Sequence, residues 1–338
     1  MRHLRKLLFL LPGTTKQFLS GGLTAELNTL KLARQICEAE VVTYRQREKD
    51  ALFLDDVLRD RMFAESIFVV SWGFDVPKLL KRLGNRPTIY HAHSTGYGFS
   101  LPPRVPILTV SRNSMGYWGQ RAISSLIYYL PNEISPDFKN HHLEREIDVL
   151  VQARKSSEYL LEQLVPALQK QCRVVVLNHY VDDLIGLFNR SKVYLYDSAE
   201  YWSCYRLSEG FGLPPMEALA CGMQVFSSVN HALADYLDPG FNCHKISGYA
   251  TGYDVQRILH TLEHWETQPT LPDNFFGSYR SDQIISRLQV ILEDVNTFFD
   301  YQSTTPTDIP QLTSGRIAQL KVRRMLQKVK ARLTKKTD

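Results

Sequence analysis

Short apolar runs alternate with amphipathic stretches along most of this chain. The runs that read as buried strands in the first part of the sequence are residues 7–11, 41–44, 67–71, 88–92, 107–110 and 127–130. A second series follows at residues 147–152, 174–177, 193–196 and 224–227. Between most of these runs the apolar residues recur at helical spacing, as Leu23, Leu27, Leu30 and Cys37 do. Strands that alternate with helices are typical of βαβ units and parallel sheets.

The two series of strands predict two domains in this chain of 338 residues, a length that allows each domain its own core. The polar segment 131–145, which carries Pro131 and Pro136, is the natural linker. We therefore expect an α/β fold with an N-terminal domain over residues 1–135 and a C-terminal domain over residues 146–300. Both domains should be Rossmann-like and doubly wound, and they should face each other across a cleft. An amphipathic helix at 281–299 ends the second domain.

Residues 304–338 differ in composition from both domains. A run rich in Pro and Thr precedes a tail, residues 316–338, with nine Lys or Arg and one Asp. Apolar residues recur among these cations at helical spacing: Ile317, Leu320, Met325, Leu326, Val329 and Leu333. Such a basic amphipathic helix commonly lies on an anionic membrane surface, but a solvated tail with one face packed on the body fits the pattern equally well. We expect no nucleic-acid binding, because no recognised module accompanies the charge.

Composition narrows the class of protein further. Hydrophobic residues make up 44% and charged residues 22% of the chain, which is ordinary for a soluble globular protein. The five cysteines are widely spaced and include no Cys-x-x-Cys pair, so neither a disulfide framework nor a zinc site is expected. A cytoplasmic location is then the simplest one. The apolar run at 7–11 is too short for a signal peptide or a membrane span, so any membrane contact should be peripheral.

The strongest chemical signal is residues 208–222, which read SEGFGLPPMEALACG. Two glycines flank Phe211, two prolines follow, and a run of helix formers ends at Gly222, so we expect a loop that leads into a short helix. Such a loop and helix N-terminus bring free backbone N–H groups to one place, where a phosphate is stabilised. Glu209 lies in the loop and Glu217 in the expected first helical turn. Two carboxylates beside an anion site should point at hydroxyl groups, which indicates a phosphorylated sugar or nucleoside.

This segment resembles the Glu-x7-Glu signature of retaining nucleotide-sugar glycosyltransferases with the GT-B fold, in particular those of glycosyltransferase family 4. The resemblance implies that Glu217 holds the ribose hydroxyls of a nucleoside-diphosphate sugar and that Glu209 holds hydroxyls of the transferred sugar. It also implies that the diphosphate is bound at Gly210, Phe211, Gly212 and Leu213. Members of the family retain the anomeric configuration and need no metal, so we expect neither a metal nor a cofactor.

Segments of the expected first domain extend the resemblance. Gly21 and Gly22 are similar to the family's glycine-rich turn, whose backbone approaches the donor phosphates, although an ordinary strand-to-helix turn explains two glycines equally well. The run Ile-Tyr-His-Ala-His at 89–93 resembles the region where one histidine lies against the transferred sugar, and we favour His93 over His91. Residues 108–111 and 130–134 resemble the segments that close the first domain, but Glu133 stands where the family usually has Gly. The helix expected at 281–299 is similar to a late helix of the family that crosses back to the first domain, although core packing explains it equally well.

Two adjacent cations end the first predicted strand of the second domain. In the family an Arg and a later Lys neutralise the donor diphosphate, and Arg154 and Lys155 are similar to this pair, with a shorter spacing and with Ala153 where the family has Gly. Adjacent side chains converge only across a tight turn, so we expect one of them to bind phosphate and the other to be solvated. Arg154 is better suited to bidentate contacts. Surface charges at a strand end are the simpler alternative. Residues 178–180, Asn-His-Tyr, stand where the family's loop receives the nucleotide base, and the resemblance implies that an aromatic side chain there stacks on the base.

The sequence therefore predicts an enzyme, a retaining glycosyltransferase. It would move a sugar from a nucleoside-diphosphate sugar to a hydroxyl group of a carbohydrate or lipid-linked acceptor, in polysaccharide or envelope-glycan synthesis. One alternative is a catalytically degenerate GT-B protein that binds sugar nucleotides as a scaffold, which the departures from the family at Glu133, Ala153 and Lys155 favour. Another is a different GT-B enzyme, such as an epimerase or a phosphorylase. The donor base, the sugar, the acceptor, the linkage and the oligomeric state do not follow from the sequence.

Overall fold

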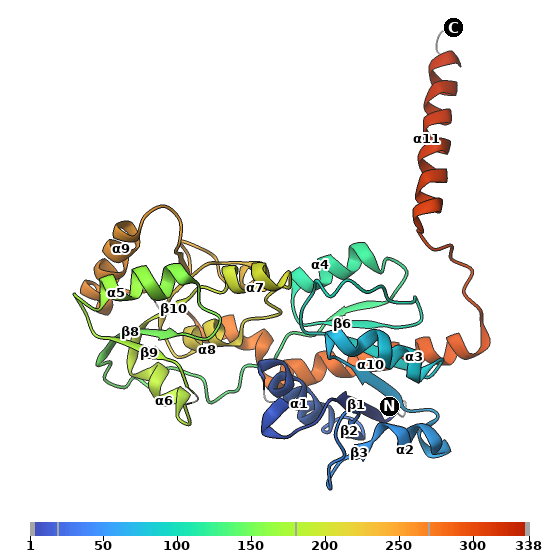
Figure 1. The fold of residues 1–338 in the computed structure, drawn as a ribbon, viewed down its shortest axis with the longest axis horizontal. Helices are drawn as coiled ribbons and strands as arrows, with labels where there is room; N and C mark the ends of the chain where they lie inside the picture. Colours follow the sequence, from blue (N-terminus) through green and yellow to red (C-terminus); the bar gives the residue numbers. More distant parts are fainter. Residues whose placement is uncertain (1–3, 19, 180, 270, 335–338) are drawn as a thin grey trace.

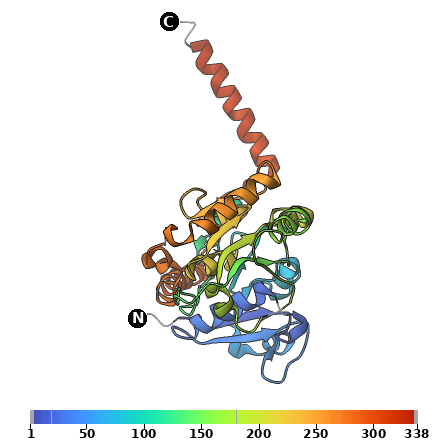
Figure 2. The ribbon, with the colours of Figure 1, turned by 90° about the vertical axis from the view of Figure 1, so that its left-hand side faces the viewer.

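The computed structural model describes residues 4–18, 20–179, 181–269 and 271–334. Within them the chain forms two α/β domains, each built on a parallel sheet, and a long helix that stands apart from both (Figures 1 and 2). Each strand expected from the apolar runs is present. The runs form strands because a parallel sheet covered on both faces buries nearly every side chain of its inner strands.

The first sheet has the strand order β3-β2-β1-β4-β5-β6-β7. Its strands are β1 (Leu7–Leu11), β2 (Ala39–Thr43), β3 (Leu52–Phe53), β4 (Ile67–Val70), β5 (Thr88–Ala92), β6 (Ile107–Thr109) and β7 (Ile127–Tyr129). Leu7 pairs with Ala39 on one side and with Ile67 on the other, so β1 lies inside the sheet. The helices that connect these strands are α1 (Gly21–Ala33), α2 (Leu54–Arg59), α3 (Val76–Leu83) and α4 (Arg112–Arg121).

The second sheet has the strand order β12-β11-β10-β8-β9. Its strands are β8 (Ile147–Gln152), β9 (Val174–Leu177), β10 (Ser191–Tyr196), β11 (Gln224–Ser227) and β12 (Cys243–Lys245). Its helices are a π-helix (Tyr159–Leu164) continued by α5 (Val165–Leu168), then α6 (Leu184–Asn189), α7 (Ala199–Tyr205), α8 (Leu213–Ala220) and α9 (Thr251–Glu263). The sequence pattern missed β3 and β12, because edge strands of two and three residues leave no periodic signal.

Helices cover both faces of each sheet. In the first domain Leu7 and Phe9 of β1 pack with α1 and α10 (Ser281–Thr304), whereas Leu8 and Leu10 pack with α2, α3 and α4. In the second domain alternate residues of β8 and β10 likewise pack with the π-helix, α5 and α9 on one face and with α6 and α8 on the other. This layering follows from the two-residue period of a strand. The predicted fold class, two doubly wound domains, is confirmed.

The chain crosses between the domains at residues 131–146 and returns at the start of α10. Ile284 and Leu288 of α10 pack in the core of the first domain, so this helix belongs to the first domain in space although it follows the second in sequence (Figure 1). Arg280 joins the two crossings. Its guanidinium donates hydrogen bonds to the carbonyl oxygens of Ser135 at 2.6 Å and Phe138 at 3.0 Å.

The basic tail forms α11 (Ser314–Thr334), which projects away from the rest of the molecule (Figures 1 and 2). Its apolar side chains are exposed: Val322 by 59%, Met325 by 69% and Leu326 by 59%. The arrangement in which one face of the tail packs on the body is therefore not the one observed. Among the described helices, none has both the length and the apolar character that crossing a membrane requires.

Candidate active site

The order of strands reverses once in each sheet, and both reversals face one cleft. In the first sheet, β2 lies on one side of β1 and β4 lies on its other side. In the second sheet, β9 and β10 flank β8 in the same way. Ligands of open α/β sheets bind beyond the carboxyl ends of the strands at such switch points. The segments after β1, β4, β5, β8 and β10 therefore converge, and together with the loop at 209–214 they line one cavity.

This cavity has a volume of about 400 Å³, within the range of small-molecule sites. The first domain contributes Ser20, Gly21, Gly22, Ala25, Ser71, Trp72, Gly73, Phe74, His93, Ser94, Tyr97 and Asn132. The second domain contributes Gln152, Arg154, Lys155, Tyr196, Tyr201, Trp202, Glu209, Gly210, Phe211, Gly212, Leu213 and Pro214. Of the site residues expected from the sequence, Gly21, Gly22, His93, Arg154, Lys155, Glu209, Gly210, Phe211, Gly212 and Leu213 line this cavity, and Glu217 does not.

Gly21 and Gly22 are the first two residues of α1, and the expectation of a turn at this position was wrong. Ser20 caps the helix, and its hydroxyl accepts a hydrogen bond from the backbone N–H of Leu23 at 3.2 Å. A Cβ at Gly21 would have no neighbour within 4 Å. The two glycines therefore leave open space above the first N–H groups of a helix, where an anion is favoured.

The loop at 209–214 leads into α8 as expected. Gly212 precedes the helix with φ of 81°, a left-handed conformation that favours glycine, and Pro214 lies in the first helical turn. Gly210 is required for a different reason: a Cβ there would overlap the backbone carbonyl of His93. The phosphate-binding loop predicted in the second domain thus touches the end of β5 in the first domain.

A buried contact between the domains surrounds this point. The Ser94 hydroxyl donates to the carbonyl oxygen of Ser208 at 2.7 Å, and the backbone N–H of Thr95 donates to the Ser208 hydroxyl at 3.0 Å. Gly96, at φ of 100°, lies against the backbone of Arg206. These contacts fix the first-domain wall of the cavity against its second-domain wall.

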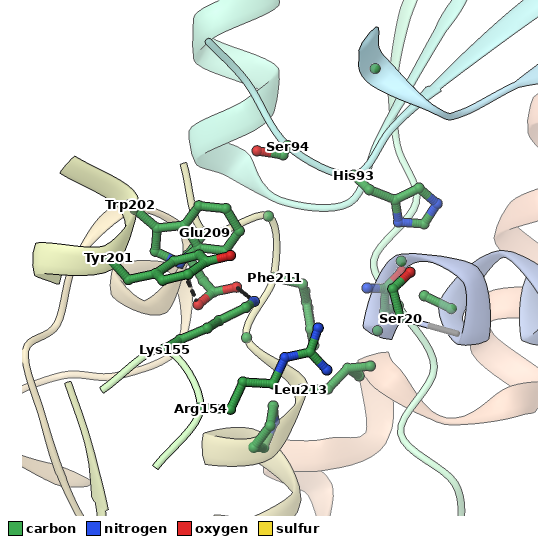
Figure 3. A pocket seen from close by; sticks show the side chains of 18 of the residues that line it. Ser20, His93, Ser94, Arg154, Lys155, Tyr201, Trp202, Glu209, Phe211 and Leu213 are labelled. Atoms are coloured by element: carbon green, nitrogen blue, oxygen red, sulfur yellow. Dashed lines mark hydrogen bonds and ion pairs between the residues drawn. The ribbon is translucent and has the colours of Figure 1, made fainter. Parts of the chain in front are cut away.

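The adjacent cations have different surroundings. Lys155 has φ of 70°, in the left-handed region, but the two side chains do not share a partner, and Lys155 is partly buried and paired where the second cation was expected to be solvated. The Lys155 ammonium lies 3.6 Å from Glu209 Oε1 and 4.3 Å from the ring centroid of Trp202. The exposed Arg154 side chain makes no hydrogen bond or ion pair with any other described residue and extends into the space between the domains (Figure 3). Arg154 is therefore the cation that remains available to an anionic ligand.

Glu209 is 5% exposed, and its carboxylate is held from three sides. Oε2 accepts hydrogen bonds from the Tyr196 hydroxyl at 2.6 Å and from Trp202 Nε1 at 2.8 Å, while Oε1 faces Lys155 (Figure 3). Burial and the nearby carboxylate raise the pKa of Tyr196 well above its usual value, so this hydroxyl stays a donor. The arrangement orients Glu209 rigidly and leaves acceptor capacity on Oε1.

Glu217 lies in the second turn of α8, not in the first, because the helix already begins at Leu213. It does not line the cavity described above, so the structure does not bring it together with the other predicted residues. Burial raises the pKa of its carboxyl to about 7. A ligand that reaches Glu217 has to extend beyond this cavity along α8.

His93 is the histidine at the cavity, and His91 is buried behind it. The His93 side chain is 14% exposed and the His91 side chain 1% exposed. Both imidazoles contact the buried carboxylate of Glu26, a residue that sequence reasoning missed. Glu26 shares a helical face with Leu23 and Leu30, and an acid at an otherwise apolar position was the available signal.

Four aromatic residues were also missed. Trp202 and Tyr201 follow β10 on α7, and Trp72 and Phe74 follow β4; all of them line the cavity. Their position directly after predicted strands was the only indication in the sequence. Tyr180, which the sequence suggests as a stacking partner for a nucleotide base, lies outside the described residues.

Known proteins resemble this chain in the sequence of its second domain and in its fold. Residues 142–276 match the family model of glycosyl transferases group 1. A segment of 81 residues is 35% identical to the serotype-specific mannosyltransferase WbdA of Escherichia coli; it covers 23% of this chain and only 8% of WbdA.

Two solved structures are similar over most of this chain. A glycosyltransferase from Rickettsia africae ESF-5 has a TM-score of 0.63 at 10% identity and covers 87% of this chain and 99% of its own. Anabaena Alr3699/HepE, solved with UDP and glucose, has a TM-score of 0.63 at 15% identity and covers 86% of this chain and 100% of its own. At these identities the likeness is one of fold, and that fold is GT-B.

Proposed function

We propose that this chain is a retaining glycosyltransferase that moves a sugar from a nucleoside-diphosphate sugar to a hydroxyl group in polysaccharide or envelope-glycan synthesis. One observation carries the proposal. Arg154, which has no hydrogen-bond or ion-pair partner among the described residues, the N–H groups at the start of α1 and at Gly212 and Leu213, and the fixed carboxylate of Glu209 all meet at one cavity between two domains. A cation and helix N-termini favour a diphosphate, and a fixed carboxylate accepts from sugar hydroxyls.

In this proposal the bond between the anomeric carbon and the diphosphate oxygen breaks, and its electron pair leaves with the nucleoside diphosphate. The new bond forms to the acceptor oxygen, whose proton passes to the oxygen of the departing diphosphate. Arg154 and the N-terminus of α8 stabilise the charge that grows on the leaving group. Lys155 faces Glu209 and keeps that carboxylate in place, so its part in diphosphate binding is secondary. Glu217 binds the ribose farther along α8.

We also propose that the reaction needs no divalent cation, since Arg154 and the helix N-termini supply positive charge at the diphosphate. Turnover that persists unchanged in excess EDTA supports this part. Activity that is lost in EDTA and restored by Mg²⁺ or Mn²⁺ contradicts it.

Thermal unfolding with UDP, GDP, ADP and TDP tests the donor site directly. A nucleotide at a hundred times its dissociation constant stabilises the folded state by about 2.7 kcal/mol. One nucleotide should raise the midpoint of the wild type and raise that of Glu217→Ala less. If none of the four nucleotides shifts the wild type, the proposed donor site is wrong. A shift without turnover on a broad acceptor panel favours the sugar-nucleotide-binding scaffold.

We propose that α11 attaches the protein to an anionic membrane surface on its cytoplasmic side, where a lipid-linked acceptor is one candidate. Its support is the projecting helix with exposed Val322, Met325 and Leu326 and no acidic residue between Arg316 and Thr334. A second copy of α11 would meet this one with like charges, which disfavours pairing of the tails. Vesicles containing phosphatidylglycerol should sediment the wild type, neutral phosphatidylcholine vesicles should not, and Val322→Glu/Leu326→Glu should abolish binding.

A further inference from the structure

Glu26 connects α1 to the end of β5 through two histidines. Glu26 Oε2 lies 2.7 Å from His91 Nδ1 and 2.6 Å from His93 Nε2, and the centroids of the two imidazole rings are 4.3 Å apart. Glu26 and His91 are each 1% exposed, so two of the three partners are shielded from water. Of these three residues, only His93 lines the cavity.

The charges in this cluster are set by burial and hydrogen bonding. Burial by itself raises the pKa of Glu26, but the attraction and the hydrogen bonds of His91 and His93 outweigh it and hold the pKa at about 2. Burial, together with His91, lowers the pKa of His93 although Glu26 opposes this. Near neutral pH the carboxylate is therefore ionised and the imidazole of His93 is neutral.

A neutral imidazole carries one proton, and its partner decides which nitrogen holds it. An ionised carboxylate only accepts, so the bond between Glu26 and His93 requires the proton on Nε2. Nδ1 of His93 is then an acceptor, and it is the ring nitrogen left for a ligand in the cavity.

We propose that Glu26 is a positioning residue. It holds His93 in the Nε2–H tautomer, so that Nδ1 accepts a hydrogen bond from a hydroxyl group of the sugar in the cavity. His91 donates to the same carboxylate oxygen and fixes the angle at which Glu26 meets His93. The identity of the hydroxyl rests on the proposed function, whereas the tautomer does not.

A metal ion held by the same three residues is the competing explanation, because their ligand atoms lie within 4.8 Å of one another. Glu26 Oε1 and His91 Nε2 are also buried without a hydrogen-bond partner in the part of the chain that the structure describes. However, zinc ligands at their usual bond lengths in a tetrahedral site lie roughly 3.4 Å apart. The observed separations of 2.6 and 2.7 Å are those of direct, charge-assisted hydrogen bonds.

NMR of the full chain labelled with ¹⁵N-histidine tests the tautomer without any ligand. The His93 signals, assigned by their loss in His93→Asn, should show a protonated Nε2 and an unprotonated Nδ1 near neutral pH. Glu26→Gln has the same shape but offers an N–H as well as a carbonyl, so it should populate the other tautomer. A wild type in which His93 carries its proton on Nδ1 overturns the proposal, and so does one zinc ion bound per chain that is lost in Glu26→Gln.

Kinetics then test the positioning role. With the donor nucleotide found by thermal unfolding, Glu26→Gln should lower turnover about 10- to 100-fold. Its affinity for the free nucleoside diphosphate should stay near that of the wild type, because Glu26 does not line the cavity and is not one of the groups proposed to bind the diphosphate. Glu38→Gln, which changes an exposed carboxylate in the same domain, is the matched control. An equal loss of turnover in Glu26→Gln and Glu38→Gln, or unchanged turnover in Glu26→Gln, refutes the positioning role of Glu26. If no nucleotide binds the wild type, the proposed function fails while the NMR result still decides the tautomer.

Discussion

Gly210 and His93 belong to different domains, yet their backbones are in direct contact, and no side chain fits at Gly210 against the His93 carbonyl. Both residues line the cavity, so the contact lies in the wall where the two domains meet. Its existence depends on two chain segments that are more than a hundred residues apart. Loops that close over a substrate exclude water and complete the site.

Gly210→Ala should therefore keep both domains folded but hold them apart. Turnover should fall by about 100-fold, because a displacement of the reacting groups by roughly 1 Å lowers the rate by about that factor. Nucleotide affinity should change much less. Donor kinetics and calorimetric titration measure the two quantities. Gly252→Ala, in a helix with no neighbour within 4 Å of the new Cβ, is the control. Normal turnover in Gly210→Ala would mean that catalysis does not use this contact.

Trp202→Phe should loosen Glu209 while leaving an aromatic ring beside Lys155. It removes the hydrogen bond from Nε1 to Glu209 Oε2, and losing a buried bond to a charged group costs about 1–3 kcal/mol of unfolding free energy. Denaturant unfolding measures this cost, and turnover should fall with it. Tyr205→Phe, which alters an exposed aromatic residue on the same helix outside the cavity, should change neither quantity. Matching effects in the two variants would argue against a specific role for the indole N–H.

Arg154→Ala should weaken nucleoside diphosphate binding by about 10- to 100-fold, because hydrogen bonds between charged groups are worth about 1.5–3 kcal/mol. Arg154→Lys should recover only part of this, since an ammonium cannot make bidentate contacts. Calorimetric titration of each variant provides the comparison. Arg121→Ala, on the exposed side of α4, controls for the loss of net charge. If Arg154→Ala binds the nucleoside diphosphate as tightly as the wild type does, another cation binds the diphosphate.

Glu217 should make the stability of the protein fall with rising pH. Burial raises the pKa of its carboxyl from 4.5 to about 7, so between these values the folded state binds more protons than the unfolded state. The stabilisation is complete below about pH 4.5 and is lost as the pH rises through about 7. The stability of Glu217→Gln relative to the wild type should increase by about 2 kcal/mol between pH 5 and pH 8. Denaturant unfolding at both pH values measures it, and Glu266→Gln, an exposed acid, should show no such trend.

The sequence alone determined the order of the strands along the chain and the loop that leads into α8. Runs such as Leu7–Leu11 and Ile147–Gln152 became strands with the predicted bounds, because burial on both faces demands unbroken apolar sequence. The positions of glycine and proline likewise predicted the turn at Gly212 and the start of α8, since glycine permits a left-handed backbone and proline favours the first helical turn.

Only the tertiary structure decided which side chains meet. Glu26, His93, Trp202 and Glu209 come from four separate segments, and their contacts depend on the strand order of two sheets and on how the domains face each other. Whether Arg154 or Lys155 stays free was settled by the left-handed backbone at Lys155 and by the position of Glu209. Local periodicity carries no record of such long-range pairings, because it reports on each element alone.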